Sequence, residues 1–298
     1  MLASGVLTAC SGTAADHAPV PTSAGPTPGA VTVAVPDVVV TVTNPGAEPR
    51  TTLARHATPD ATQQVSLTAN SAITQTVGTN ASTDQSSPDV TLPIAASQHG
   101  AADAPTHSVG LVVDVPSSPD STLAAALLKA KGSRATLVAG PDGAVKQLVL
   151  DPPADLSDAG RSAVEQALRQ AVQFAPVLPS ASVGVGAVWT VSQQINSLGL
   201  GVRQDTVLTL AAVRGSTVTL AVQVTQTPLT PTWTLPNDQG TLNVDSYALA
   251  GTGNLTVDLT KPLPLDGQVQ LTGDQVYSRP KDGLKITQKV SNGVSWKS

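Results

Sequence analysis

Gln63–Val77 reads QQVSLTANSAITQTV, and its side chains alternate between apolar and polar types. In an extended chain, one side of this stretch would carry Val65, Leu67, Ala69, Ile73 and Val77. The other side would carry Gln64, Ser66, Thr68, Asn70, Thr74 and Thr76. A period of two residues is typical of a strand with one face buried and the other in water. We therefore predict a half-buried antiparallel strand here.

The same alternation recurs towards the C-terminus, at Val218 to Val224 and at Leu255 to Leu259. Glycine-containing pairs at Arg214-Gly215 and Asp266-Gly267 are typical of turns between such strands. Strands joined in succession by short turns form an antiparallel meander, and a large meander must curl to shelter its apolar side. Nearly all of the chain after Val188 is therefore expected to be strand.

The first β-like stretch, VTVAVPDVVVTVTNPG (Val31 to Gly46), contains Pro36. Proline cannot donate a ladder hydrogen bond. We expect an edge strand here, or a pair of short strands.

Two stretches have helical rather than strand periodicity. The first, near residues 118–131, begins with Ser118 as the expected N-cap and Pro119 at the first helical position, and Gly132 follows it. The second, near residues 157–175, spaces Val164, Leu168, Ala171 and Val172 along one face. The predicted fold class is therefore mainly β (α+β): a large curved antiparallel meander or half-barrel sheet with two packed amphipathic helices.

The overall composition excludes several classes of protein. Only 12% of the 298 residues are charged and 2% are aromatic, against 24 Gly and 24 Pro. The net charge of −5, without a cluster of Lys or Arg, argues against a nucleic-acid partner. No stretch of 18 consecutive apolar residues is present to span a bilayer.

Cys10 is the only cysteine of the chain, so it cannot form an internal disulfide. The preceding residues, Leu7-Thr8-Ala9, together with Cys10, resemble the bacterial lipoprotein signal motif, in which cleavage precedes a cysteine that then carries lipid. Secretory signals are longer than nine residues and open with basic residues, so we expect the true start to lie upstream. The resemblance implies a diacylglycerol and an N-acyl chain on Cys10, and two signals suffice for stable membrane anchoring.

The domain organisation follows from this motif. Residues 1–10 are the expected signal remnant, residues 11–30 a flexible tether rich in Pro, Thr and Ala, and residues 31–298 a β-rich domain. The predicted location is the extracytoplasmic side of the cell membrane, held there by lipid.

Three phrases carry a family resemblance. They are VTNPGAEPRTTLARHATPDATQQVSLTANSAITQTV, SVGVGAVWTVSQQ and GTGNLTVDLTKPLPLDGQVQL. They resemble a family of uncharacterised exported lipoproteins from actinobacteria, over most of the chain after the tether. The order of strands, two helices and a longer meander is also similar in outline to half-barrel lipoproteins that carry acylated lipids in bacterial envelopes. A shared architecture alone does not establish function.

The sequence shows none of the commonest catalytic motifs. No HExxH, GxSxG or GxxxxGK pattern occurs, so we predict no enzyme activity, no metal site and no cofactor. The histidines, His17, His56, His99 and His107, lie in the tether or in loop-like stretches and are interpreted as surface residues. Trp233 lies between prolines in an expected loop, where an indole can rim a pocket.

These observations favour a non-catalytic lipoprotein that binds an apolar or amphiphilic envelope molecule, such as a lipid or glycolipid. The predicted ligand-binding residues are Val164, Leu168, Ala171, Val172 and Trp233. The alternative is a structural or adaptor lipoprotein with a solid core that contacts protein or cell-wall polymer; no particular protein partner is indicated. A cavity of several hundred Å³ would favour the first interpretation and complete packing the second.

Overall fold

A computed structural model describes residues 30–33, 35–56, 62–100, 104–197, 199–235 and 240–298. Most of these residues belong to one antiparallel sheet of 15 strands. Its strands in the first half of the chain are β1 (Val31–Val33), β2 (Val38–Asn44), β4 (Thr62–Val77), β5 (Thr83–Asp84), β6 (Ser87–His99), β7 (His107–Val113), β8 (Arg134–Ala139) and β9 (Val145–Asp151). Those in the second half are β11 (Val188–Ser197), β12 (Leu200–Arg214), β13 (Thr217–Pro228), β14 (Thr232–Thr234), β15 (Thr241–Asp258), β16 (Asp266–Ser278) and β17 (Lys285–Lys297). This sheet confirms the predicted mainly β fold.

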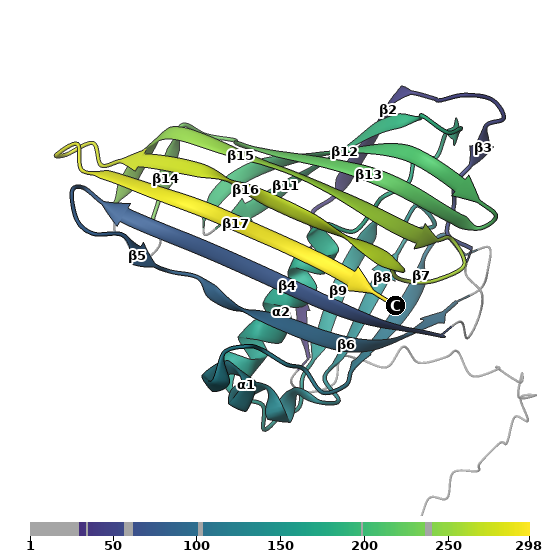
Figure 1. Ribbon diagram of the computed structural model, residues 1–298, viewed down its shortest axis with the longest axis horizontal. Helices are drawn as coiled ribbons and strands as arrows, with labels where there is room; N and C mark the ends of the chain where they lie inside the picture. The colour runs from purple at the N-terminus through teal and green to yellow at the C-terminus, as the bar shows by residue number, and fades with distance from the viewer. Residues whose placement is uncertain (1–29, 34, 57–61, 101–103, 198, 236–239) are drawn as a thin grey trace, which may run out of the picture.

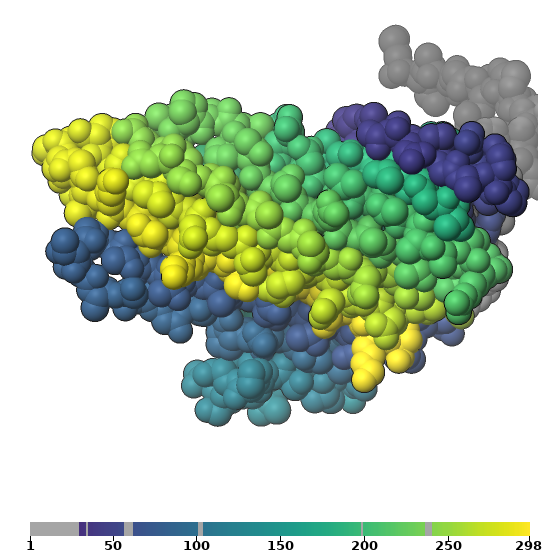
Figure 2. Space-filling model, turned by 45° about the horizontal axis from the view of Figure 1, so that its top comes forward, coloured from purple at the N-terminus to yellow at the C-terminus, as the bar shows by residue number. Residues whose placement is uncertain are grey.

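The strand order is β1-β9-β8-β7-β6-β4-β17-β16-β15-β13-β12-β11-β2, with β14 paired to β15 and β5 to β4. Two meanders are thus joined at a seam where β4 pairs with β17, for example Trp296 opposite Leu67. A separate two-stranded sheet pairs β3 (Thr51–Thr52) with β10 (Ser182–Val183). The outer face of the second meander forms a continuous surface (Figure 2).

The two edges of the large sheet are formed by β1 and β2, which do not pair in the described structure, so the sheet stays open. The prediction that Pro36 would split this stretch into two short strands is confirmed. Only residues 34–37 separate β1 from β2 in the sequence. Because each residue spans at most about 3.6 Å, Cα atoms of Val33 and Val38 lie within about 18 Å of each other. The sheet is therefore curled enough to bring these ends of its two edges within about four strand spacings of each other.

Glycines on β15 and β16 permit this curvature. A Cβ atom at Gly253 would collide with the backbone of Gln268 and Val269 on the neighbouring strand. Gly267 has φ +124° and lies inside β16 rather than in the turn that Asp266-Gly267 was predicted to form. The turn instead spans residues 259–265. Glycine inside a strand is typical of tight bends and close backbone approach.

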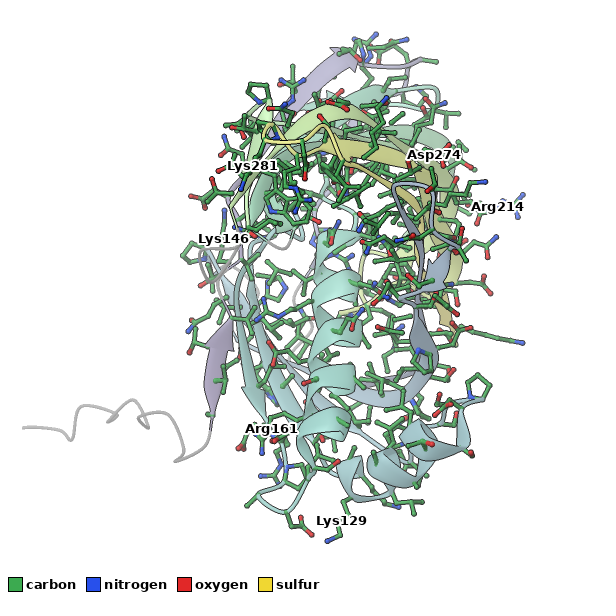
Figure 3. All side chains as sticks on the ribbon, turned by 90° about the vertical axis from the view of Figure 1, so that its left-hand side faces the viewer. Lys129, Lys146, Arg161, Arg214, Asp274 and Lys281 are labelled. Atoms are coloured by element: carbon green, nitrogen blue, oxygen red, sulfur yellow. The ribbon has the colours of Figure 1, made fainter. Side chains whose placement is uncertain are left out.

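Two helices accompany the sheet. Helix α2 (Asp158–Gln173) begins after Ser157, whose side chain accepts a hydrogen bond from the Gly160 backbone. It lies on the inner side of the sheet, with strands on both flanks (Figures 1 and 3).

Helix α1 (Ser121–Leu127) continues into a 3-10 turn, η1 (Leu128–Ala130). Its N-cap is Asp120, which accepts from the Leu123 backbone at 2.7 Å, so the prediction of Ser118 as the N-cap was wrong. In a short helix the aspartate has the geometry and charge that the N-terminus requires.

The strands alternate as the sequence predicts, with buried residues facing α2. In β6 the burial pattern changes at every residue from Val90 to Gln98. The main core contains fully buried leucines from both meanders, including Leu67, Leu92, Leu148, Leu208, Leu220 and Leu255. A second, smaller cluster contains Leu200, Val202, Leu242 and Tyr277. The inner side of the sheet is where a site can be sought.

Candidate functional site

Helix α2 and the strands β4 to β9 enclose an apolar space that we call the inner cavity. The strands supply Val65, Leu67, Ile94, Val109, Leu111 and Leu137, and α2 supplies Leu168, Ala171 and Val172. The free volume is about 50 Å³, enough for a few water molecules. Alternation on the strands and the 3.6-residue period of α2 direct these side chains towards each other.

A larger space, the edge cavity, lies between the two edges of the sheet. It measures about 470 Å³ and is lined by Val33, Val35, Pro36, Leu148, Val172, Gln173, Ile195 and their neighbours. Val33, Val35 and Pro36 bound it on one side, and the β11 residues from Gln193 to Asn196 bound it on the other. Val172 lines both cavities, so they are adjacent along the C-terminal half of α2.

Two polar side chains stand at one end of the inner cavity. Arg55 is 8% exposed and His107 is 5% exposed, and both line this otherwise apolar space. Nη1 of Arg55 donates to the backbone carbonyls of Lys261 (3.0 Å) and Pro262 (3.2 Å), which belong to the turn between β15 and β16. Gly143, in the turn between β8 and β9, makes room for the guanidinium, because a Cβ there would lie 2.8 Å from Nε of Arg55.

Burial perturbs both groups. It lowers the pKa of Arg55 to about 10, partly opposed by the charge of Asp142. Burial also lowers the pKa of His107, assisted by the positive charge of Arg55 and opposed by Asp142. His107 is the first residue of β7, so its interpretation as a surface histidine was wrong. At pH 7 the pair therefore combines a charged guanidinium with a neutral imidazole.

Beyond the C-terminal end of α2, the inner side of the sheet is lined by amides. Gln193, Gln204 and Gln226 stand opposite one another on β11, β12 and β13. Tyr247, Gln275, Gln288 and Gln75 continue on β15, β16, β17 and β4. We call these residues the amide row.

Hydrogen bonds connect the amide row. Nε2 of Gln226 donates to Oε1 of Gln204 at 2.9 Å, and the Tyr247 hydroxyl donates to Oε1 of Gln226 at 3.1 Å. Gln173, the last residue of α2, donates from Nε2 to Oε1 of Gln204 at 2.7 Å. Burial raises the pKa of Tyr247 to about 12. The row thus ties the end of α2 to the second meander through neutral groups.

The four predicted ligand-binding residues on α2 occupy two places. Leu168, Ala171 and Val172 line the inner cavity. Val164 is 4% exposed and lines only a space of about 20 Å³ near Arg161. Cys10 and the predicted tether up to residue 29 lie outside the described residues.

Trp233 does not line the inner cavity. It belongs to the short strand β14 rather than to a loop, and its ring packs against Tyr277 with centroids 5.0 Å apart. Both residues join the smaller apolar cluster with Leu200 and Leu242.

Sequence reasoning missed Arg55 and His107. Arg55 stands in no periodic stretch, whereas His107 continues the alternation of Val109 and Leu111 along β7; only the folded chain brings Arg55 and His107 together. Among the described residues no group of three His, Cys, Asp or Glu side chains could hold a metal ion. No helix within the described part of the chain is both long and apolar enough to cross a membrane.

A scan of the chain against protein-family models finds no match, and a search of curated proteins finds no significant relative. The site is therefore interpreted from its own geometry.

Proposed function

We propose that this protein is a cell-envelope lipoprotein that binds an apolar or amphiphilic molecule, such as a lipid or glycolipid, without catalysing a reaction. The observation that carries this proposal is the adjacency of the inner and edge cavities along α2. The edge cavity, at about 470 Å³, is within the usual size range of ligand sites. Apolar side chains of α2 and of the strands would cover an acyl chain, and burying its surface would supply the affinity.

A solid-core adaptor remains the second candidate, and one observation favours it. The inner cavity holds only about 50 Å³ of free space, so a chain entering it must displace α2 or its neighbours. Within the proposed function, the edge cavity receives the ligand first, and the end of α2 moves to extend the space. The amide row is the connection that would have to give way.

The binding test is a replacement that fills the inner cavity. Ala171→Trp places an indole where the ligand chain is expected, whereas Ala125→Trp, on the exposed side of α1, serves as the matched control. We expect the first variant to bind a fluorescent fatty-acid probe at least about tenfold more weakly and the second to bind like the wild type. Unchanged binding by the Ala171 variant, or no binding by the wild type, would favour the adaptor.

Natively purified protein offers a direct complement. Mass spectrometry of its organic extract should identify a bound envelope molecule in stoichiometric amount. An extract without any envelope molecule, together with no binding of the fluorescent fatty-acid probe, would contradict ligand binding.

Membrane attachment is proposed through Cys10. In a bacterial host that processes lipoproteins, a secreted form of the chain should be found in the membrane fraction and carry acyl chains. Cys10→Ala should move it to the soluble fraction. If the variant stays with the membrane and the wild type carries no lipid, the proposed anchor is wrong.

A further inference from the structure

Arg55 stands out because it is a buried charge without a carboxylate partner. No described carboxylate lies within ion-pair distance of its guanidinium. Asp142, the nearest acid by its electrostatic effect, uses Oδ1 to accept from the backbone of Ala144 at 3.0 Å. Burying an unpaired charge is costly, and native proteins normally compensate it.

The hydrogen bonds of Arg55 leave part of the guanidinium unused. Nη1 donates to the two backbone carbonyls at Lys261 and Pro262, whereas Nε and Nη2 have no acceptor among the described residues. A guanidinium presents its donors in a planar fork that matches two oxygen atoms of one carboxylate or phosphate. The hydrogen bonds to the turn between β15 and β16 therefore use only one of the three guanidinium nitrogens of Arg55.

His107 adds a second unpaired polar group at the same place. Its side chain is 95% buried and makes no hydrogen bond to any described residue, although it lines the inner cavity beside Arg55. A neutral imidazole can donate one hydrogen bond from its N–H nitrogen. Both residues are mostly buried, both keep side-chain nitrogens without an acceptor in the described part of the chain, and both line the end of a space whose other walls are apolar.

We propose that Arg55 and His107 form the subsite for an anionic head group, a carboxylate or a phosphate monoester, of an acyl amphiphile. The inference rests on the proposed function and assigns the ligand a direction. The head group binds at Arg55, and the chain runs between α2 and the strands past Leu168 and Val172 towards the edge cavity. The low polarity around the pair strengthens its attraction for an anion.

The charge of Arg55 in this subsite excludes a neutral amphiphile as the preferred ligand. A hydroxyl head group would leave the guanidinium charge uncompensated, whereas a carboxylate neutralises it and accepts from both unused nitrogens. Hydrogen bonds to charged groups are stronger than those between neutral groups. Preference for the anion should therefore be large and should depend on Arg55.

The test compares ligands of equal chain length on the full chain. Dissociation constants of sodium dodecanoate and dodecanol are measured by titration calorimetry at pH 8. We expect the wild type to bind dodecanoate at least about tenfold more tightly than dodecanol. Arg55→Gln should bring the two dissociation constants within about twofold of each other. The dissociation constant for dodecanol should stay as in the wild type. The matched control is Arg214→Gln, because Arg214 is exposed and points away from α2 (Figure 3).

The outcomes separate this inference from the proposed function. Equal binding of both ligands by the wild type would overturn the anionic subsite and leave amphiphile binding standing, whereas binding of neither would overturn both. The ratio in the wild type needs no variant, so it decides the matter even if Arg55→Gln fails to fold. In that case His107→Asn provides the second variant, and we expect it to reduce the preference severalfold.

A further arm identifies the source of the anion. Dodecyl phosphate should bind at least about a hundredfold more tightly than inorganic phosphate, because the acyl chain supplies most of the buried area. Equal affinity would show a site for a small free anion and would overturn the direction assigned to the chain.

Discussion

The inner side of this sheet is lined in two different ways. From β4 to β9, beneath α2, most inward positions are leucine, isoleucine, valine or alanine. Beyond the end of α2, one row of inward positions, which runs across β11 to β17 and ends on β4, carries the amide row instead. The alternation of each strand decides which side chains face inward. Whether α2 packs over that part of the sheet decides whether those side chains are apolar or polar. Under a helix the strands are apolar, and beside its end polar groups are accommodated because they bond to one another.

The largest effect is expected in the covered region. Leu92 on β6 is completely buried in the main core. Leu92→Ala should lower the free energy of unfolding by about 2 to 5 kcal/mol, through lost burial and the cavity left behind. Leu128→Ala, where the leucine is 71% exposed, is the control and should change it by less than about 0.5 kcal/mol. Urea unfolding measures both, and a loss below 1 kcal/mol for Leu92→Ala would contradict a tightly packed region beneath α2.

The amide row should be less costly to disturb. Gln204→Leu removes the acceptor used by both Gln173 and Gln226, so one half-buried and one buried amide lose a partner. We expect a loss of about 1 to 3 kcal/mol in urea unfolding. Gln223→Leu, on the exposed face of β13, is the matched control. A neutral or stabilising Gln204→Leu would show that apolar packing can replace the row, and the contrast between the two regions would then lose its energetic basis.

Alkaline pH should act on the amide row. Burial raises the pKa of Tyr247 from 10.0 to about 12, so the folded protein keeps this proton where the unfolded chain loses it. The stability linked to Tyr247 is therefore complete below pH 10 and is lost as the pH rises towards 12.

Tyr247→Phe should cost about 1 kcal/mol at pH 8, since the hydroxyl no longer donates to Gln226. The difference from the wild type should then shrink above pH 10. Parallel stability curves from pH 8 to pH 12 would contradict the raised pKa. Tyr277 is present in both proteins, and burial raises its pKa in each; the smaller contribution that the charge of Tyr247 makes to the pKa of Tyr277 is lost in the variant and is part of the measured difference.

Acid should act on the covered region, with the smallest effect. Burial lowers the pKa of His107, so the unfolded chain takes up a proton below pH 6.5 that the folded protein resists. The linked stability is present above pH 6.5 and is lost as the pH falls through the folded value. His107→Gln should make the decline in stability between pH 7 and pH 5 shallower than in the wild type. An unchanged slope in this variant would show that His107 does not resist protonation.

Local sequence patterns predict where the strands and helices lie better than they predict which strands pair with each other. The alternation of Gln63–Val77 identifies β4 because one face is buried, and Pro36 marks the break between β1 and β2. Gly267 was misread as a turn, since nothing local reveals that the backbone of β15 passes too close for a Cβ. Pairing of β4 with β17 depends on the whole chain and is not encoded in either strand alone.

The candidate site was predictable only in part. Helical spacing identifies the apolar face of α2, and Leu168, Ala171 and Val172 do line the inner cavity. The volume of that cavity depends on how closely α2 approaches the sheet. The spacing of apolar residues in the sequence does not predict this distance. Arg55 and His107 were missed because they come together only when the turns after β8 and β15 close over the end of the sheet.

The seam between β4 and β17 has a consequence for the order of folding. It joins residues as far apart in the sequence as Ser66 and Lys297, the widest separation that the sheet contains. A ribosome completes β4 long before β17, so the first meander can form early, but β4 keeps an unpaired edge until β17 is made. Such distant contacts slow folding, and unpaired edges invite aggregation. The residues of β17 therefore complete the main core, and a chain shortened before β17 would leave β4 and β16 each without a neighbour on one side.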